Sequence, residues 1–181
     1  VSTKPQAKEI VKQAAIDAGM PYLVDRWIGG FLTNFSELKK LIQKYLSLKE
    51  QMESGELERY TKKEQLEMSR QLEKMEKSLG GLTTLTSMPD AIFVPAMQKE
   101  KTAVTEANRT NVPVIGVCDT NANPDKAALV IPANDDAVKS ITMIVGLVAA
   151  AAKEGREAFA KKQQAAPKVE KKDKKEEAPA A

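Results

Sequence analysis

The feature that most constrains the fold is a change in the spacing of apolar residues at position 38. From there, apolar side chains recur at alternating steps of three and four residues, which is the spacing of a coiled-coil seam. The predicted seam comprises Leu38, Leu41, Tyr45, Leu48 and Met52 in a first helix, and Met68, Leu72, Met75 and Leu79 in a second. This spacing predicts two long helices that pair along one narrow stripe.

Two turn signals divide and end this helical region. The run 54–56, Ser-Gly-Glu, interrupts the seam, and Thr61 followed by Glu64 is the capping-box pattern that begins a helix. The pair Gly80-Gly81 then ends the second helix. Two helices joined by a short connection run antiparallel. Residues 36–81 are therefore predicted to form an antiparallel coiled-coil helical hairpin.

The segments on either side of the hairpin carry short apolar runs instead. AIFVPA at 91–96, PVIGVCD at 113–119 and ALVIP at 128–132 are nearly continuous and rich in β-branched residues, a pattern typical of parallel strands covered on both faces. A helical stretch around Thr102–Arg109 is long enough for the crossover between the first two strands. A further run, MPYLV at 20–24, has the length of another buried strand.

Two further helices are predicted beside the strands. Pro5 suits a first helical turn, and Gly19 ends the helix that follows. After the third strand, Asn134 is a helix-capping residue with Asp135 and Asp136 in the first turn. Strands that alternate with helices predict an α/β fold. We expect a parallel-sheet domain of the flavodoxin or Rossmann-like class, into which the helical hairpin is inserted.

The predicted organisation has three parts. Residues 1–35 and 82–163 form the α/β domain, and residues 36–81 form the inserted hairpin. Residues 164–181 consist mainly of Lys, Glu, Ala and Pro without apolar periodicity, so we expect a disordered charged tail. Because Val1–Lys4 has the pattern of a strand end that enters a helix, we expect the strands that precede it in such a domain to be missing.

Composition argues against several functional classes. The chain contains no His and one Cys, which removes Ser-His-Asp and Cys-His nucleophiles and the usual structural zinc sites. We predict no catalytic residue, metal site or cofactor. With one Cys, no long apolar span and no signal-type segment, we expect a cytoplasmic protein without a membrane role. The net charge of +3, from 28 basic and 25 acidic residues, is too small to identify a nucleic-acid binder.

The segment DTNANPD at 119–125 partly matches a calcium-binding loop. The match fails because Pro124 takes the place of the required Gly and Val130 that of the bidentate Glu, so we predict a turn held by Asn and Asp side chains. Asp119 would lie at the carboxyl end of a parallel strand, where such sheets bind ligands, but no glycine-rich phosphate loop occurs. A nucleotide or sugar-phosphate binding enzyme is an alternative that rests on fold analogy.

The stretch RWIGGFLTNF at 26–35 is the most informative part of the chain and contains its one Trp. Paired glycines let a backbone approach another surface closely, and an Arg pairs with phosphate or stacks on a base. The alternative is that Trp27, Phe31 and Phe35 fix the hairpin to the sheet. We expect these aromatic residues mainly to pack and Arg26 mainly to face RNA.

Five motifs in order resemble one family. They are RWIGGFLTNF, a heptad hairpin that ends in LGGL, MPDAIFV, PVIGVCDTNANPD and VIPANDDA. Their order over residues 1 to about 160 resembles that of the second protein of the bacterial small ribosomal subunit. Two departures are Ser2, where Gly is commoner in the family, and the lack of His.

The resemblance implies a non-enzymatic, structural role in translation on the cytoplasmic ribosome. It implies that the α/β domain binds ribosomal RNA, contacts neighbouring ribosomal proteins and helps to seat the large mRNA-capturing one. It implies no small-molecule substrate. Phosphate contacts would then dominate the affinity for RNA, which should weaken steeply with salt.

We expect the RNA contacts at the base of the hairpin and the neighbouring sheet edge. Residues 36–79 carry 10 basic and 9 acidic groups, a balance that argues against a general RNA-binding arm. The expected RNA-facing residues are Lys4, Arg26, Trp27, Asn34, Lys39, Lys40 and Lys44. For each Lys, an ordinary solvated helix face is an equal alternative. A coiled-coil adaptor for another protein is the third functional class that the sequence allows.

Overall fold

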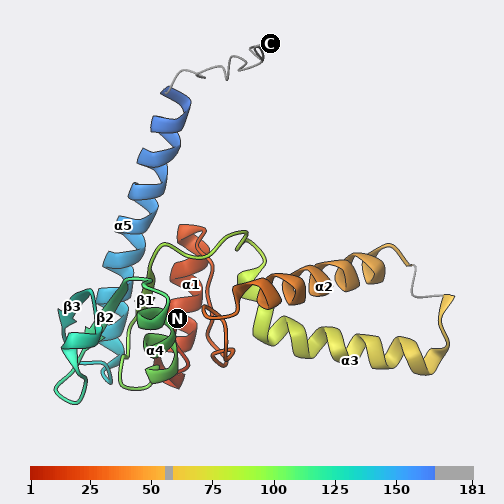
Figure 1. Ribbon diagram of the computed structural model, residues 1–181, viewed down its shortest axis with the longest axis horizontal. Helices are drawn as coiled ribbons and strands as arrows, with labels where there is room; N and C mark the ends of the chain where they lie inside the picture. The colour runs from red at the N-terminus through yellow and green to blue at the C-terminus, as the bar shows by residue number, and fades with distance from the viewer. Residues whose placement is uncertain (56–58, 166–181) are drawn as a thin grey trace, which may run out of the picture.

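The structure is a computed structural model that describes residues 1–55 and 59–165. It contains a three-stranded parallel sheet, which lies at the opposite side of the molecule from the projecting tip of α2 (Phe35–Glu53) and α3 (Lys62–Leu79) (Figure 1). The strands are β1 (Ile92–Val94), β2 (Val114–Cys118) and β3 (Leu129–Pro132), in that order across the sheet. Helix α4 (Lys101–Arg109) connects β1 to β2, and the short helix η3 (Pro124–Lys126) lies between β2 and β3. The apolar runs at 91–96, 113–119 and 128–132 thus form the predicted parallel strands.

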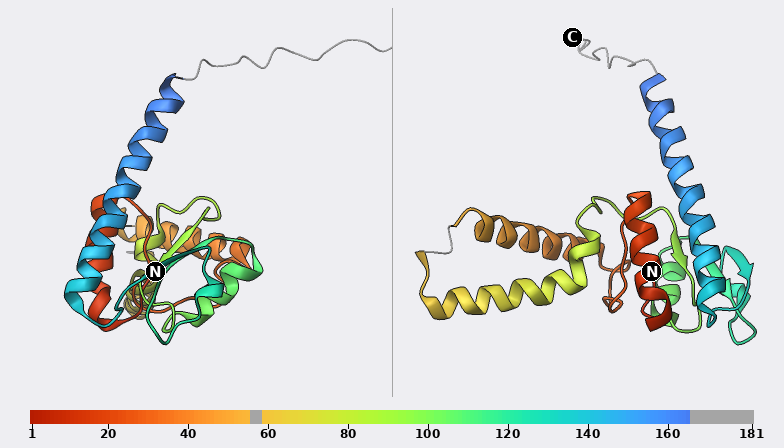
Figure 2. Two further views of the ribbon diagram at one scale, coloured as in Figure 1. Left: turned by 90° about the vertical axis from the view of Figure 1, so that its left-hand side faces the viewer. Right: turned by 180° about the vertical axis from the view of Figure 1, so that it is seen from behind.

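Helices lie on both sides of this sheet. Helices α1 (Pro5–Ala18) and α5 (Val138–Ala165) pack against each other on one side, and α4 contacts β2 on the other (Figure 2). The alternation along β1 separates two apolar clusters: Ile92 and Val94 join the cluster that includes α4, whereas Phe93 packs against the cluster formed by α1 and α5. The fold is therefore an α/β domain with a parallel sheet, as predicted from the sequence.

The helix boundaries follow the predicted signals closely. Gly19 adopts φ +64° directly after α1, a left-handed conformation that favours glycine. Thr61 and Glu64 form the predicted capping box at the start of α3 (Lys62–Leu79). The Asn134 side chain accepts hydrogen bonds from two following backbone N–H groups. Helix α5 begins only at Val138, however, so the two aspartates predicted in its first turn precede the helix.

Helix α5 continues to Ala165, two residues into the segment predicted to be a disordered tail. The rest of that predicted tail, residues 166–181, lies outside the described part of the chain. Among the helices in the described ranges, none combines the length and the hydropathy needed to cross a membrane.

Helices α2 (Phe35–Glu53) and α3 project together from the α/β domain and run in opposite directions (Figure 1). We refer to them as the helix pair. The predicted seam is wrong in α2 at Leu41 and Met52, whose side chains are exposed, whereas Ile42 is buried. The buried residues of α2 are instead Leu38, Ile42 and Tyr45. At 3.6 residues per turn, these positions lie on one face of the helix, which is the face toward α3 and the domain. In α3, the predicted seam residues are all buried or half-buried: Met68, Leu72, Met75 and Leu79.

Three strand predictions are wrong, and the first is the strand end at Val1–Lys4, which is not in a strand. Residues 20–24 form no strand, because their described backbone contacts to other segments are isolated hydrogen bonds, such as Tyr22 N–H to the Gly81 carbonyl, rather than a ladder. Strand β3 exists but is not covered on both faces, since Leu129 is 58% exposed and Val130 is 38% exposed. As the last strand in the sheet order, β3 has one neighbour among the described strands, β2.

Candidate nucleic-acid interface

The loop before α2, residues 26–34, is built around a buried carboxylate from α4. Glu106 Oε1 accepts hydrogen bonds from Trp27 Nε1 at 3.0 Å and from the Gly30 N–H at 2.9 Å. Glu106 Oε2 accepts a third from the Leu32 N–H at 3.1 Å. A carboxylate suits this position because both of its oxygens are acceptors, and the loop supplies donors. The three bonds tie the start of the helix pair to the α/β domain.

The same contacts set the protonation state of Glu106, which is 8% exposed. Burial raises the pKa of its carboxyl group, but hydrogen bonds from Trp27 and from the backbone of Gly30 and Leu32 lower it more, so that the pKa lies below its ordinary value. The carboxylate is therefore charged at neutral pH and stabilised by N–H donors.

The aromatic residues of this loop face inward. Trp27 is 8% exposed and Phe31 is buried, with their ring centroids 4.8 Å apart, while Phe35 packs half-buried against the same core. This confirms the prediction that these residues fix the helices to the sheet. It also corrects the expectation that Trp27 faces RNA, because its ring lies in the core and its N–H is bonded to Glu106.

The remaining expected RNA-facing residues of this region lie on the surface: Arg26, Asn34, Lys39, Lys40 and Lys44 are exposed. Lys40 and Lys44 are four residues apart and share one face of α2, while Lys39 is turned from Lys40 by about 100°. Lys40 pairs with Glu37 at 2.7 Å, an exposed ion pair that water screens strongly. Asn34 precedes α2 without a side-chain cap to its backbone, and instead accepts a bond from the Ser36 hydroxyl.

Lys4 has a different environment from the other expected RNA-facing residues. Its Nζ lies 3.0 Å from Asp135 Oδ1 and 2.7 Å from Asp136 Oδ1, and its side chain is 13% exposed. Partial burial lowers the pKa of Lys4, but the hydrogen bonds and charges of Asp136 and Asp135 raise it more, leaving it above its usual value. The expectation that Lys4 faces RNA is therefore corrected, because its ammonium group is paired with Asp135 and Asp136 inside the protein.

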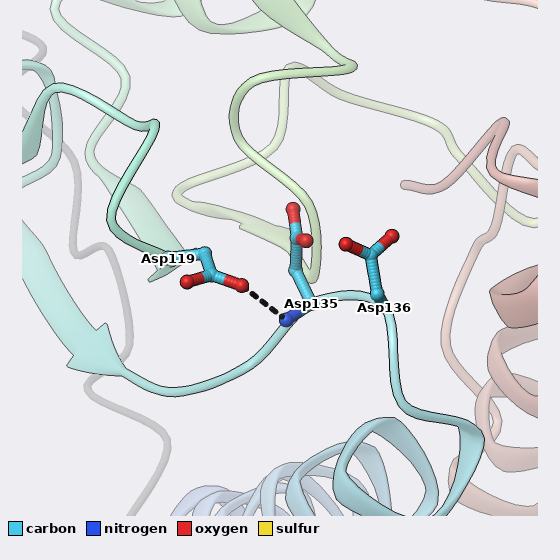
Figure 3. Close-up of side chains that lie close together, drawn as sticks. All are labelled: Asp119, Asp135 and Asp136. Atoms are coloured by element: carbon cyan, nitrogen blue, oxygen red, sulfur yellow. Dashed lines mark hydrogen bonds between the residues drawn. The ribbon is translucent and has the colours of Figure 1, made fainter.

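Asp119 joins the same cluster from the end of β2 (Figure 3). Carboxylate oxygens of Asp119, Asp135 and Asp136 come within 4.8 Å of one another, and Asp119 Oδ2 accepts the Asp135 N–H at 3.3 Å. Hydrogen bonds from the backbone of Thr120 and Asp135 hold the pKa of Asp119 below its usual value. The cluster thus joins β2 to the segment before α5, and Lys4 links it to α1.

The rest of the DTNANPD segment forms the predicted turn. Asp119 Oδ1 accepts the Thr120 N–H at 2.7 Å, and Asn123 Oδ1 accepts the Asp125 N–H at 2.9 Å. Both side chains satisfy local backbone donors, and the Asn123 bond to the second following residue is that of an Asx turn.

A cavity of about 560 Å³ lies between α1, α5 and β1. Apolar side chains such as Val11, Phe93 and Val145 dominate its lining, and Asp119 is not among its lining residues. A nucleotide site needs groups that bind phosphate, so the cavity does not favour the enzyme alternative.

Comparison with known proteins decides the family. The family model described as ribosomal protein S2 matches residues 1–155. The chain belongs to the ribosomal protein S2 family. It is 46% identical over 155 residues to the small ribosomal subunit protein uS2 of Parabacteroides distasonis, an alignment that covers 86% of this chain and 56% of that protein.

Two further relatives in the ribosomal protein S2 family carry the same name, small ribosomal subunit protein uS2. That of Aliarcobacter butzleri is 47% identical over 160 residues, covering 88% of this chain and 60% of the relative, and that of a Psychrobacter species is 44% identical over 163 residues, covering 90% and 62%. The chain therefore spans about three fifths of the length of these relatives.

The role of Glu106 in this S2-family chain was not predicted from the sequence, although a signal was present. Ala103, Glu106 and Ala107 follow helical spacing, so the carboxylate falls on the same face as two small apolar residues. A single charged residue on the buried face of a short helix indicates a partner with several donors. That signal identifies the buried acid, but the loop that binds it becomes evident only from the fold.

Proposed function

We propose that this chain is a structural constituent of the small ribosomal subunit that binds ribosomal RNA at the base of the helix pair. The observation that carries the proposal is membership of the ribosomal protein S2 family, whose named relatives are small-subunit proteins. The role is architectural and non-enzymatic, exercised on the cytoplasmic ribosome.

The distribution of charge supports an interface at the base rather than along the whole helix pair. Residues 36–79 are nearly balanced, with 10 basic and 9 acidic groups. The loop 26–34 and the first turns of α2, by contrast, expose Arg26, Lys39, Lys40 and Lys44. The exposed acids beside them are Glu37, which pairs with Lys40, and Asp25, which pairs with Lys8. Phosphate contacts from such residues supply sequence-independent affinity, while the shape of the RNA supplies selectivity.

The proposal assigns different roles to the seven expected residues. Arg26, Lys39, Lys40 and Lys44 contact phosphate, and Asn34 contacts RNA at the start of α2. Trp27 and Lys4 are left out, because their polar groups are bonded to Glu106 and to Asp135 and Asp136, respectively.

We further infer that the helix pair is an antiparallel coiled coil inserted in a Rossmann-like domain. Support comes from the burial of Leu38, Tyr45 and Leu79 and from the half-buried methionines of α3. The insertion holds the basic residues beside the α/β domain. We propose that the domain also contacts neighbouring small-subunit proteins and helps to seat the large mRNA-capturing one during translation.

Co-sedimentation tests this function. The chain, expressed in bacterial cells, should sediment with small ribosomal subunits at low salt and dissociate as the salt concentration rises, because salt competes with phosphate contacts. Recovery as free protein at low salt, from cells with intact small subunits, would contradict the proposal.

A further inference from the structure

Three N–H donors of the loop 26–34 converge on one side chain that lies behind the loop. They come from Trp27, Gly30 and Leu32, and all three bind the carboxylate of Glu106 at 2.9 to 3.1 Å. Within residues 1–55 and 59–161, no Lys or Arg forms an ion pair with Glu106. Among the described residues, the charge of the Glu106 carboxylate is therefore stabilised by the backbone N–H groups of the loop and by the indole N–H of Trp27.

The chemistry of the cluster requires a carboxylate. A Gln at position 106 has one acceptor oxygen, and an NH₂ group takes the place of the other oxygen. If the NH₂ group replaces Oε2, two donors face each other, and the Leu32 N–H loses its acceptor. A buried N–H without a partner is costly, and the backbone moves to find water instead. Glu106 thus determines the backbone path of the loop, and not simply its attachment.

The two glycines of the loop have different environments. Gly30 adopts φ +82°, a conformation that favours glycine, and its N–H is one of the three donors. Gly29 is exposed, its φ is not positive, and a Cβ built on it would meet no atom within 4 Å. Internal packing therefore demands no glycine at position 29. A bare backbone at the surface suits close approach of another molecule, such as a sugar–phosphate chain.

We propose that Glu106 is a positioning residue for RNA binding, which fixes the loop 26–34 from behind so that Arg26 and the backbone of Gly29 face the RNA. This inference rests on the proposed function and names the part of the α/β domain on which that function depends. Glu106 itself is buried and touches no RNA. Its effect on RNA affinity passes through the loop, in which Arg26 and Gly29 are exposed.

A double-mutant cycle tests the inference with the full chain and transcribed small-subunit ribosomal RNA. Glu106→Gln and Arg26→Ala should each weaken binding about tenfold and reduce the slope of log affinity against log salt by about 1. The double variant should bind more tightly than the sum of the two single losses predicts, because Glu106 acts in part through Arg26. Additive losses, or a Glu106→Gln variant that binds as wild type does, would overturn the inference.

A matched control separates positioning from general stability. Glu100 is also buried and directly precedes α4. It accepts hydrogen bonds from the N–H and the hydroxyl of Thr3 rather than from the loop 26–34. Glu100→Gln should leave RNA affinity within about twofold of wild type. An equal loss of RNA affinity in Glu100→Gln and Glu106→Gln would mean that both act through folding alone, and would also overturn the inference.

Loop order in the free protein provides a readout that does not depend on RNA. Glu106→Gln should speed hydrogen exchange of the Gly30 and Leu32 amides and change the fluorescence of Trp27, the one Trp of the chain, while Glu100→Gln should do neither. Unchanged exchange in Glu106→Gln would contradict the inference. If Glu106→Gln does not fold, Glu106→Asp replaces it, because Asp keeps the charge but withdraws the carboxylate by one methylene. A Glu106→Asp variant with the hydrogen exchange and the RNA affinity of wild type would also contradict the inference.

The outcomes also distinguish this inference from the proposed function. Failure of the wild-type chain to bind the RNA at low salt would refute the proposed function, and the inference with it. Binding by wild type, combined with equal binding by a Glu106→Gln variant whose loop amides exchange faster, would refute the inference and leave the proposed function intact.

Discussion

The backbone N–H of Tyr22 donates a hydrogen bond to the carbonyl of Gly81 at 2.9 Å, which joins the segment after α1 to the end of the helix pair. The approach is close: a Cβ on Gly81 would lie 2.3 Å from the Tyr22 carbonyl oxygen and 2.7 Å from its ring. Glu106 holds the start of the helix pair, and Tyr22 holds its end. Both connections to the α/β domain are therefore fixed by specific contacts.

Gly81→Ala should destabilise the fold, because the new methyl group meets the backbone carbonyl of Tyr22 as well as its ring. We expect a loss of about 2 kcal/mol in the free energy of unfolding, measured by urea denaturation. Gly80→Ala is the control, since a Cβ there would meet Glu76 Cγ at an ordinary 3.6 Å. Equal stabilities of the two variants would show that the contact with Tyr22 is not a constraint.

Lys4→Met should be strongly destabilising, because it leaves Asp135, which is almost completely buried, without its cation. Removing one member of a buried ion pair costs about 3 kcal/mol. Lys8→Met breaks a similar pair, with Asp25 at 2.9 Å, whose side chains are 32% and 46% exposed, and should cost less than about 1 kcal/mol. Thermal unfolding of both variants gives the comparison, and a Lys4→Met variant as stable as Lys8→Met would contradict the assigned role.

Stability at acid pH should depend on Glu106. The pKa of Glu106 is lower in the folded than in the unfolded protein. Its contribution to the free energy of unfolding is therefore complete above the ordinary pKa of 4.5, and it is lost as the pH falls through the lower pKa of the folded state. Asp119 shifts in the same direction from 3.8. Glu106→Gln should therefore lose less stability than wild type as the pH falls below 4.5, in melting curves recorded over that range. Parallel pH profiles for the two proteins would contradict this assignment.

The sequence predicted those elements whose signals are local. Pro5 and Gly19 bound α1, Thr61 and Glu64 start α3, and the apolar runs form β1 and β2. Each signal acts through neighbours within a few residues, such as a cap or an alternating face. The family resemblance was likewise carried by ordered local motifs, and the family comparison confirmed it.

The features that the sequence did not predict depend on distant parts of the chain. The exposed fraction of Leu129 depends on whether anything covers β3, and its apolar pattern matches that of a buried strand. Leu41 and Ile42 are both apolar, so the register of the α2 seam is decided by packing against α3 and the domain. Lys4 and Trp27 have the residue types of an RNA interface, but their partners, Asp135 and Glu106, lie 131 and 79 positions away.

The most direct test of the central claim, that RNA binds at the base of the helix pair, compares two triple variants of equal charge. One replaces Lys39, Lys40 and Lys44 with Ala. The other replaces Lys49, near the end of α2, and Lys62 and Lys63, at the start of α3, so that all three lie toward the tip of the helix pair. For small-subunit ribosomal RNA, we predict that the first set weakens binding at least about tenfold and lowers the salt slope by about 2 to 3, while the second changes affinity by less than about threefold. Equal losses in the two sets, or a larger loss in the second, would contradict the account.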